Sequence, residues 1–143
     1  MMGGYMNSAK TTLWNTPQEL FNQLNEEFHF TIDVCATAQN AKCERFFSPE
    51  QDGLKQIWTG VCWCNPPYGK GIADWVKKAA TSKDATTVML LPAHTDTAWF
   101  HDYVLAIGAE IRYIRRRLKY DDGKTDAPFP SMIVIFRKEK KNA

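Results

Sequence analysis

Four consecutive residues, Asn65, Pro66, Pro67 and Tyr68, combine groups that can act together on an amine attached to a planar ring. Such an amine is a poor nucleophile because its lone pair is delocalised into the ring. The Asn65 side-chain oxygen and the Pro66 carbonyl can accept its two hydrogens, which draws the nitrogen toward tetrahedral geometry and frees the lone pair. The fixed φ angles of the two prolines hold that carbonyl still, and Tyr68 offers a flat face for stacking. The four residues therefore predict a site for a nucleobase amine, which requires a base swung out of its helix.

The elements expected around these residues place them at the edge of a sheet. Apolar runs rich in β-branched residues predict strands over 30–36, 61–64 and 87–91, and helical stretches follow the last two at 72–80 and 98–107. Repeated strand and helix indicate an α/β fold with a mostly parallel sheet. Asn65 directly follows a strand, at the edge where open α/β sheets bind ligands. Two later runs, 110–116 and 131–136, are expected to pair as an antiparallel edge hairpin.

A helix is expected to begin near residue 16. Thr16 has the type of an N-cap, Pro17 that of a first helical residue, and Glu19 is placed to close a capping box. The apolar positions that follow have helical spacing. The sequence therefore predicts an amphipathic helix ahead of the first strand.

The composition indicates one compact domain. The 143 residues are 44% hydrophobic and 24% charged, which suffices for a single core. Eighteen Lys and Arg against sixteen Asp and Glu give a net charge of +2, so any nucleic-acid contact must be local. No run approaches the roughly 18 apolar residues of a membrane span, and the first residues lack the apolar core of a signal peptide. A cytoplasmic protein without a membrane partner is expected.

Four cysteines invite a metal-site interpretation, but none of them stands at Cys-x-x-Cys spacing: they are Cys35, Cys43, Cys62 and Cys64. They are also too few, and too embedded in apolar segments, for the disulfide frame of a secreted scaffold. We expect small buried hydrophobic side chains in a reducing compartment and no metal site.

Five cations fall within eight positions, at Arg112, Arg115, Arg116, Arg117 and Lys119. One interpretation is a solvated edge strand protected from aggregation by its charge. The other is a ridge that grips DNA phosphates and leads into a polar loop, with Lys70 adding a further cation beyond the 65–68 turn. The sequence leaves both open.

The tetrapeptide resembles the catalytic motif of S-adenosylmethionine-dependent amino-methyltransferases. An ordered series of segments over roughly residues 12 to 137 is similar to the small, often phage- or prophage-borne, DNA N6-adenine methyltransferases of the Dam type. The segments are 14–21, 31–36, 40–43, 52–54, 63–69, 90–93, 95–97 and 127–132. The chain departs from the wider superfamily in lacking a glycine-rich turn after the first strand, because its next glycine is Gly53.

This resemblance implies a three-layer Rossmann-like methyltransferase fold, with a mostly parallel sheet and an antiparallel edge hairpin. It implies one catalytic domain over residues 1–143 without a separate target-recognition domain, acting on adenine N6 in double-stranded DNA. The cofactor is S-adenosyl-L-methionine, and the residues assigned to it are Trp14, Thr16, Pro17, Asp33, Cys35 and Asp52. The first three border its methionine end, Asp33 meets its ammonium, and Asp52 accepts from its adenine amine. Lys70, Arg115, Arg116, Arg117 and Lys119 are assigned to DNA.

Alternatives remain at the level of function and of single residues. The same tetrapeptide serves methyltransferases that act on RNA or on a protein glutamine, and a non-catalytic DNA-binding module can retain a degenerate site. Asp33 has the type of a helix N-cap and Asp52-Gly53 that of a tight turn. A monomer and a homodimer are both compatible with the sequence.

Overall fold

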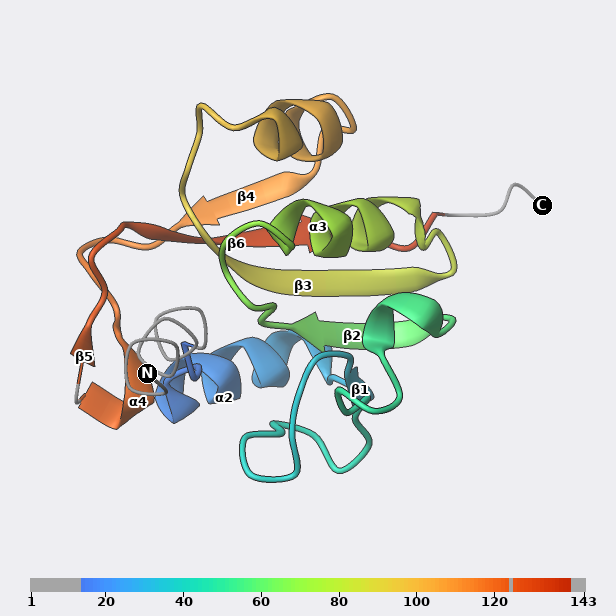
Figure 1. The fold of residues 1–143 in the computed structure, drawn as a ribbon, viewed down its shortest axis with the longest axis horizontal. Coiled ribbons are helices and arrows are strands. Elements are labelled where there is room, and N and C mark those ends of the chain that lie inside the picture. The colour runs from blue at the N-terminus through green and yellow to red at the C-terminus, as the bar shows by residue number, and fades with distance from the viewer. Residues whose placement is uncertain (1–13, 124, 140–143) are drawn as a thin grey trace, which may run out of the picture.

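The computed structural model describes residues 14–123 and 125–139, and its strands form one five-stranded sheet (Figure 1). The strands are β1 (Ile32–Asp33), β2 (Gly60–Cys64), β3 (Ala85–Pro92), β4 (Glu110–Tyr113) and β6 (Ser131–Phe136). Their order is β1-β2-β3-β6-β4, with β1, β2 and β3 parallel and β6 antiparallel to both of its neighbours. The chain therefore has a mixed α/β fold. The expected antiparallel pairing of the last two long runs is confirmed, with β6 inside the sheet and β4 at its edge.

Helices lie against both faces of this sheet. Helix α3 (Ile72–Thr81) and the π-helix η2 (Phe100–Leu105) contribute apolar side chains to a core that includes Cys62, Met89 and Val134. Helix α2 (Gln18–Phe28) packs into a second core on alternate sheet positions, among them Trp63, Val88 and Ile133. The short elements are η1 (Gly53–Lys55), α4 (Tyr120–Gly123) and β5 (Thr125–Asp126). Buried strands with side chains on both faces explain why the runs are apolar throughout.

The first strand is shorter than its predicted range of 30–36. Regular pairing covers Ile32–Asp33, but the flanking chain stays bonded to β2 through Thr31 and Val34. On its other side, Asp33 exchanges backbone hydrogen bonds with residues 45–47, donating to the Arg45 carbonyl at 3.0 Å and accepting from Phe47 at 2.9 Å. The loop after β1 therefore returns alongside the strand and covers the edge of the sheet.

The prediction that Thr16 caps the following helix is wrong. Helix α2 begins at Gln18, and Pro17 is its N-cap, with the Pro17 carbonyl accepting from the Phe21 N–H at 3.2 Å. The Thr16 side chain is buried, and its hydroxyl accepts a hydrogen bond from Asn65, 49 residues away. A long-range contact thus takes the oxygen that local capping rules assign to the helix.

The structure describes the state of the cysteines, the groups that could hold a metal ion and the length of the helices. All four cysteines are free, and burial raises the pKa of the Cys62 thiol to about 11. Over residues 14–123 and 125–139, no group of three or more His, Cys, Asp or Glu side chains is arranged to hold a metal ion. Within the same ranges, no helix has the length and apolar character needed to cross a membrane.

Candidate active site

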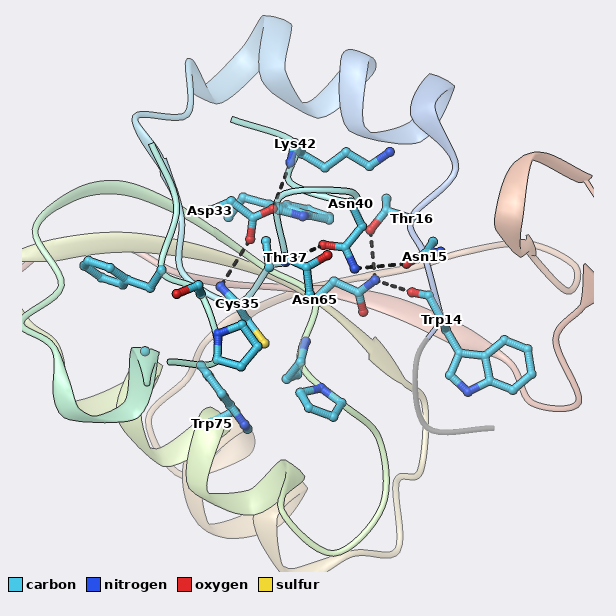
Figure 2. Close-up of a pocket in the computed structure, with 18 of the residues that line it drawn as sticks. Trp14, Asn15, Thr16, Asp33, Cys35, Thr37, Asn40, Lys42, Asn65 and Trp75 are labelled. Atoms are coloured by element: carbon cyan, nitrogen blue, oxygen red, sulfur yellow. Dashed lines mark hydrogen bonds between the residues drawn. The ribbon is translucent and has the colours of Figure 1, made fainter. Parts of the chain in front are cut away.

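A pocket of about 730 Å³ opens where β1 and β2 end (Figure 2). Its walls come from residues 14–16, 33–42, 47–53 and 63–67 together with Trp75 of α3. The position is the one that α/β sheets use for ligands. Asn65, Pro66 and Pro67 therefore meet Asp33 and Asp52 at one site although they are far apart in the chain, whereas Tyr68 does not line this pocket.

Asn65 is held in one orientation at the wall of this pocket. Its Nδ2 donates to the Trp14 carbonyl and to Thr16 Oγ1, the latter at 2.9 Å (Figure 2). Because a carbonyl oxygen can only accept, the amide cannot be flipped without losing the bond to Trp14. Its Oδ1 is buried, and no described residue donates to it. An unpaired buried acceptor is costly, so its retention beside a pocket points to a donor supplied by a substrate.

The two prolines extend this acceptor surface. Pro66 and Pro67 both line the pocket, on the turn between β2 and α3. Among the described residues, none donates a hydrogen bond to the Pro66 carbonyl. Two acceptors, the Asn65 Oδ1 and the Pro66 oxygen, are thus available on adjacent residues, as two hydrogens of one amine require.

Tyr68 is placed differently from the stacking surface that the sequence predicts. Its side chain is buried, its hydroxyl donates to the Leu90 carbonyl at 3.0 Å, and burial raises its pKa. The Phe129 ring packs edge-on against it at 5.4 Å between centroids and also contacts Trp14 and His94. Sequence reasoning missed Phe129, although a phenylalanine between two prolines just before β6 is a usable signal. Stacking on Tyr68 stays a prediction that requires Phe129 to move.

Asp33 ties down the loop that follows β1. Its carboxylate accepts from the Cys35 N–H at 3.2 Å and from the Lys42 N–H at 3.0 Å (Figure 2). The side chain is 2% exposed, and desolvation raises its pKa to about 6 against the opposing effect of those two hydrogen bonds. No helix begins directly after Asp33, so the helix-cap alternative for this residue is wrong. A buried carboxylate in the pocket wall is instead available to a cation.

The loop over 35–42, which contains no glycine, lines the pocket and is held by side-chain hydrogen bonds. The Asn40 side chain accepts from the Thr37 N–H at 2.7 Å and donates to Asn15 at 3.3 Å. The Lys42 ammonium donates to Gln18 at 2.8 Å. Side-chain hydrogen bonds therefore join this loop to the segment that leads into α2, and Asn40 and Lys42 both line the pocket.

Asp52 and Gly53 form the wall opposite this segment. Asp52 has a positive φ of 56°, and its side chain accepts from the Leu54 N–H at 3.1 Å, so the pair caps η1 rather than closing a hairpin. A Cβ on Gly53 would lie 2.1 Å from the Val34 carbonyl oxygen and 3.1 Å from the Trp75 ring. The close backbone approach at this site thus comes from Gly53. Trp75 itself, a pocket residue that sequence reasoning missed, stacks on Trp58.

The predicted cofactor residues are mostly brought together. Trp14, Thr16, Asp33, Cys35 and Asp52 line the pocket. Pro17 does not, because it lies in a neighbouring groove between α2 and residues 118–123. Burial raises the pKa of Cys35 to about 12, so its thiol is neutral in the pocket wall.

The run of five cations divides into two groups. Arg112 pairs with Glu27 at 2.7 Å and Glu110 at 2.8 Å, and Lys119 pairs with Asp126 at 2.7 Å. Arg115, Arg116 and Arg117 are exposed and make no ion pair with any described residue. The expectation that Arg112 belongs to a free basic ridge is wrong, because its guanidinium joins β4 to α2. We call residues 115–117 the basic turn.

The basic turn lies at the same end of the sheet as the pocket, where β2 and β3 have their carboxyl ends. Strand β4 is antiparallel to β6, which is antiparallel to β3, so β4 runs in the direction of β2 and β3. The residues that follow β4 therefore emerge on the side where Asn65 follows β2, as the arrowheads in Figure 1 show. Lys70, on the turn after the tetrapeptide, is exposed there too.

The sequence is similar to one protein family model and to several known proteins. Residues 4–143 match the family model described as DNA N-6-adenine-methyltransferase (Dam). The chain is 33% identical over 135 residues to the DNA N-6-adenine-methyltransferase of Haemophilus phage HP1 (strain HP1c1), covering 87% of this chain and 78% of the relative. It is 36% identical over 118 residues to that of Escherichia phage T1, covering 79% and 49% respectively. A putative methyltransferase of Escherichia coli (strain K12) is 32% identical over 63 residues.

Proposed function

Because this chain belongs to the Dam family of DNA N-6-adenine-methyltransferases, we propose that it transfers a methyl group to the N6 amine of adenine in DNA. The observation that carries this function is the Asn65 amide, whose nitrogen is held by Trp14 and Thr16 while its buried oxygen has no described donor. An exocyclic amine supplies the donor that this oxygen lacks. Its second hydrogen goes to the Pro66 carbonyl.

The pocket residues fit S-adenosyl-L-methionine as the methyl donor. The buried Asp33 carboxylate suits its ammonium, and Asp52 offers an acceptor for its adenine amine. Trp75 and Phe47 supply apolar wall in the same pocket. When bound, this cofactor supplies a methyl group on a positively charged sulfur, which is a good leaving group.

The chain's own residues perform alignment and charge stabilisation. Asn65 Oδ1 and the Pro66 oxygen accept hydrogen bonds from the two N6 hydrogens. These bonds turn the nitrogen lone pair out of conjugation with the ring and stabilise the positive charge that grows on N6. Tyr68 supports the base plane once Phe129 has moved aside. With the cofactor bound, the N6–carbon bond would form as the carbon–sulfur bond broke, and the methylated nitrogen would release one proton to water. No covalent bond to the protein is needed, and the neutral Cys35 thiol is a poor nucleophile.

The finer architecture follows from the same proposal. The described residues form a catalytic domain with a three-layer Rossmann-like methyltransferase fold. The loops over 69–74, 94–98 and 118–130 contribute to sequence recognition. The basic turn and Lys70 contact phosphates of double-stranded DNA, in the cytoplasm of a bacterial host.

Cofactor affinity is expected to depend on pH through Asp33. In the free protein its pKa is about 6, so the carboxylate is largely protonated below that pH and cannot pair with an ammonium. The dissociation constant for S-adenosyl-L-methionine should therefore rise as pH falls through 6, by about tenfold between pH 7 and pH 5. Calorimetry at a series of pH values measures this. Asp33→Asn should bind weakly at every pH, and a wild-type affinity that does not change over this range contradicts the assignment of Asp33.

The basic turn is expected to bind DNA through charge alone. Arg117→Ala should weaken binding to all DNA sequences similarly and reduce the slope of log affinity against log salt by about 1. Arg117 is preferred to Arg116 because Arg116 has a positive φ of 69°, so a substitution there also alters backbone strain. Lys83→Ala is the matched control, since Lys83 is an exposed cation at the opposite end of β3. Fluorescence anisotropy with labelled duplexes reads both variants, and a loss confined to one sequence would instead indicate a base contact.

Transfer of a tritiated methyl group to DNA, RNA and protein tests the proposal against its alternatives. The purified chain should label double-stranded DNA that lacks adenine methylation, and the label should chromatograph as N6-methyladenine. Label in RNA or on a protein glutamine would show that this active site methylates that substrate instead. A chain that gives no heat with S-adenosyl-L-methionine is a non-catalytic module.

A further inference from the structure

The hydroxyl of Tyr68 ends a buried chain of hydrogen bonds whose direction can be assigned. Tyr68 O–H lies 3.0 Å from the Leu90 carbonyl, 3.2 Å separates it from the Tyr120 hydroxyl, and 3.1 Å separates Tyr120 from Ser131 Oγ. The Leu90 carbonyl can only accept, so it takes the single Tyr68 proton. Tyr120 must then donate to Tyr68, and Ser131 must donate to Tyr120. The chain therefore runs from Ser131 through Tyr120 and Tyr68 to Leu90.

This chain is enclosed within the protein. Tyr120 is 0% exposed and Ser131 is 1% exposed, and Ser131 is the first residue of β6, paired with the last residue of β3. The Tyr120 ring also packs edge-on against Trp14 at 5.3 Å, and Trp14 holds the Asn65 amide through its carbonyl. Tyr120 thus contacts both the stacking residue of the tetrapeptide and the segment that orients Asn65.

Tyr120 also lies directly beyond the basic turn. Two residues, Leu118 and Lys119, separate the basic turn from Tyr120, and Lys119 is joined to β5 by its ion pair with Asp126 and by a backbone bridge. Leu118 accepts a backbone hydrogen bond from Ala127 at 2.9 Å, two residues before Phe129. The basic turn and Tyr120 are therefore joined by a short segment whose two residues are both held by residues 126–127.

We propose that Tyr120 is a positioning residue for methyl transfer, holding the Tyr68 ring by the one-way hydrogen-bond chain and linking the basic turn to the Asn65–Tyr68 turn. This inference rests on the proposed function, because Tyr68 is taken as the support for the target base. The hydroxyl of Tyr120, rather than its ring, carries the role. A phenylalanine at 120 keeps the ring contacts and removes the hydroxyl that donates to Tyr68 and accepts from Ser131.

A double-mutant cycle tests the proposal through kcat. Tyr120→Phe and Tyr68→Phe each keep both rings and break the same hydrogen bond, so each should lower kcat by about tenfold, with the affinity for S-adenosyl-L-methionine within twofold of wild type. Because Tyr120 acts through Tyr68, the double variant should lose no more than either single variant. Losses that multiply, or a Tyr120→Phe enzyme with wild-type kcat, overturn the proposal.

Ser131→Ala separates positioning from stability. It removes the Ser131–Tyr120 hydrogen bond, which is one of the two that Tyr120→Phe removes, and leaves the Tyr120–Tyr68 bond in place, so its melting temperature should fall no further than that of Tyr120→Phe. Its kcat should stay within threefold of wild type. Equal loss of kcat in the two variants assigns the effect to stability and contradicts the proposal.

A spectroscopic measurement separates this inference from the proposed function. In protein labelled with ¹³C at tyrosine Cζ, the Tyr68 resonance is identified by its disappearance in Tyr68→Phe. It should shift in Tyr120→Phe without any substrate, and in the wild type it should shift when duplex DNA is added. An unmoved Tyr68 resonance in Tyr120→Phe overturns the hydrogen-bond chain. If the wild-type protein shows these shifts but transfers no methyl group to DNA, the hydrogen-bond chain is supported and the proposed function is refuted.

Discussion

Asn65→Ala is expected to lower the kcat for DNA methylation by at least about a hundredfold while the affinity for S-adenosyl-L-methionine changes little. The substitution removes Oδ1, the buried acceptor for one N6 hydrogen, and leaves Asp33 and Asp52 in the pocket wall. The amine then stays conjugated to its ring and its lone pair stays unavailable. Initial rates with tritiated cofactor, combined with calorimetry of cofactor binding, measure the two effects separately.

Asn65→Asp is the informative comparison for this variant. It keeps an oxygen for the N6 hydrogen but replaces Nδ2, which donates to Trp14 and Thr16, by a second oxygen. Two acceptors then face each other at the Trp14 carbonyl, so activity should fall between those of wild type and Asn65→Ala. Unchanged turnover in Asn65→Ala, in a protein that remains folded, would falsify the role of Asn65.

Gly53→Ala is expected to destabilise the protein by about 1 to 3 kcal/mol, the usual cost of overpacking a buried site, and to weaken cofactor binding. The added Cβ would meet the Val34 carbonyl oxygen at 2.1 Å, and this contact is made by backbone that cannot rotate away. Either Val34 or residues 52–54 must shift, and both flank the pocket. For a domain of this size the melting temperature should fall by about 4 to 12 °C.

Gly71→Ala provides the matched control. Gly71 precedes α3 with a φ of −82°, and an added Cβ there would meet nothing within 4 Å. Its melting temperature and cofactor affinity should stay close to wild type. Equal behaviour of the two alanine variants would show that Gly53 is not a point of close approach.

Sequence reasoning reached the parts of this molecule that local patterns determine. The strand before Asn65, the helix after it and the antiparallel pairing of β4 with β6 follow from apolar runs and turn residues. The placement of Asn65 and Asp33 at the same end of the strands follows as well, because Asp33 ends β1 and Asn65 directly follows the parallel neighbour β2. Part of the pocket lining, eight of its nineteen residues, could therefore be anticipated.

Other features depend on contacts between distant residues, which local patterns do not contain. Thr16 has the sequence of a helix cap, but its hydroxyl serves Asn65 instead. Arg112 stands in a run of cations, but Glu27, 85 residues earlier, takes its guanidinium. Asp52-Gly53 has the sequence of a tight turn, but Gly53 also lies against the Val34 carbonyl, 19 residues earlier. In each case a tertiary contact determined the role of a residue whose local pattern suggested another.

Sequencing of modified bases in DNA from cells that express this chain tests the central claim most directly. A host that lacks adenine methylation should acquire N6-methyladenine at nearly every copy of one short sequence, and the same host expressing Asn65→Ala should acquire almost none. Nucleoside mass spectrometry on the same DNA confirms the position of the methyl group. Absence of N6-methyladenine from the DNA of cells that contain the folded wild-type chain would contradict the account.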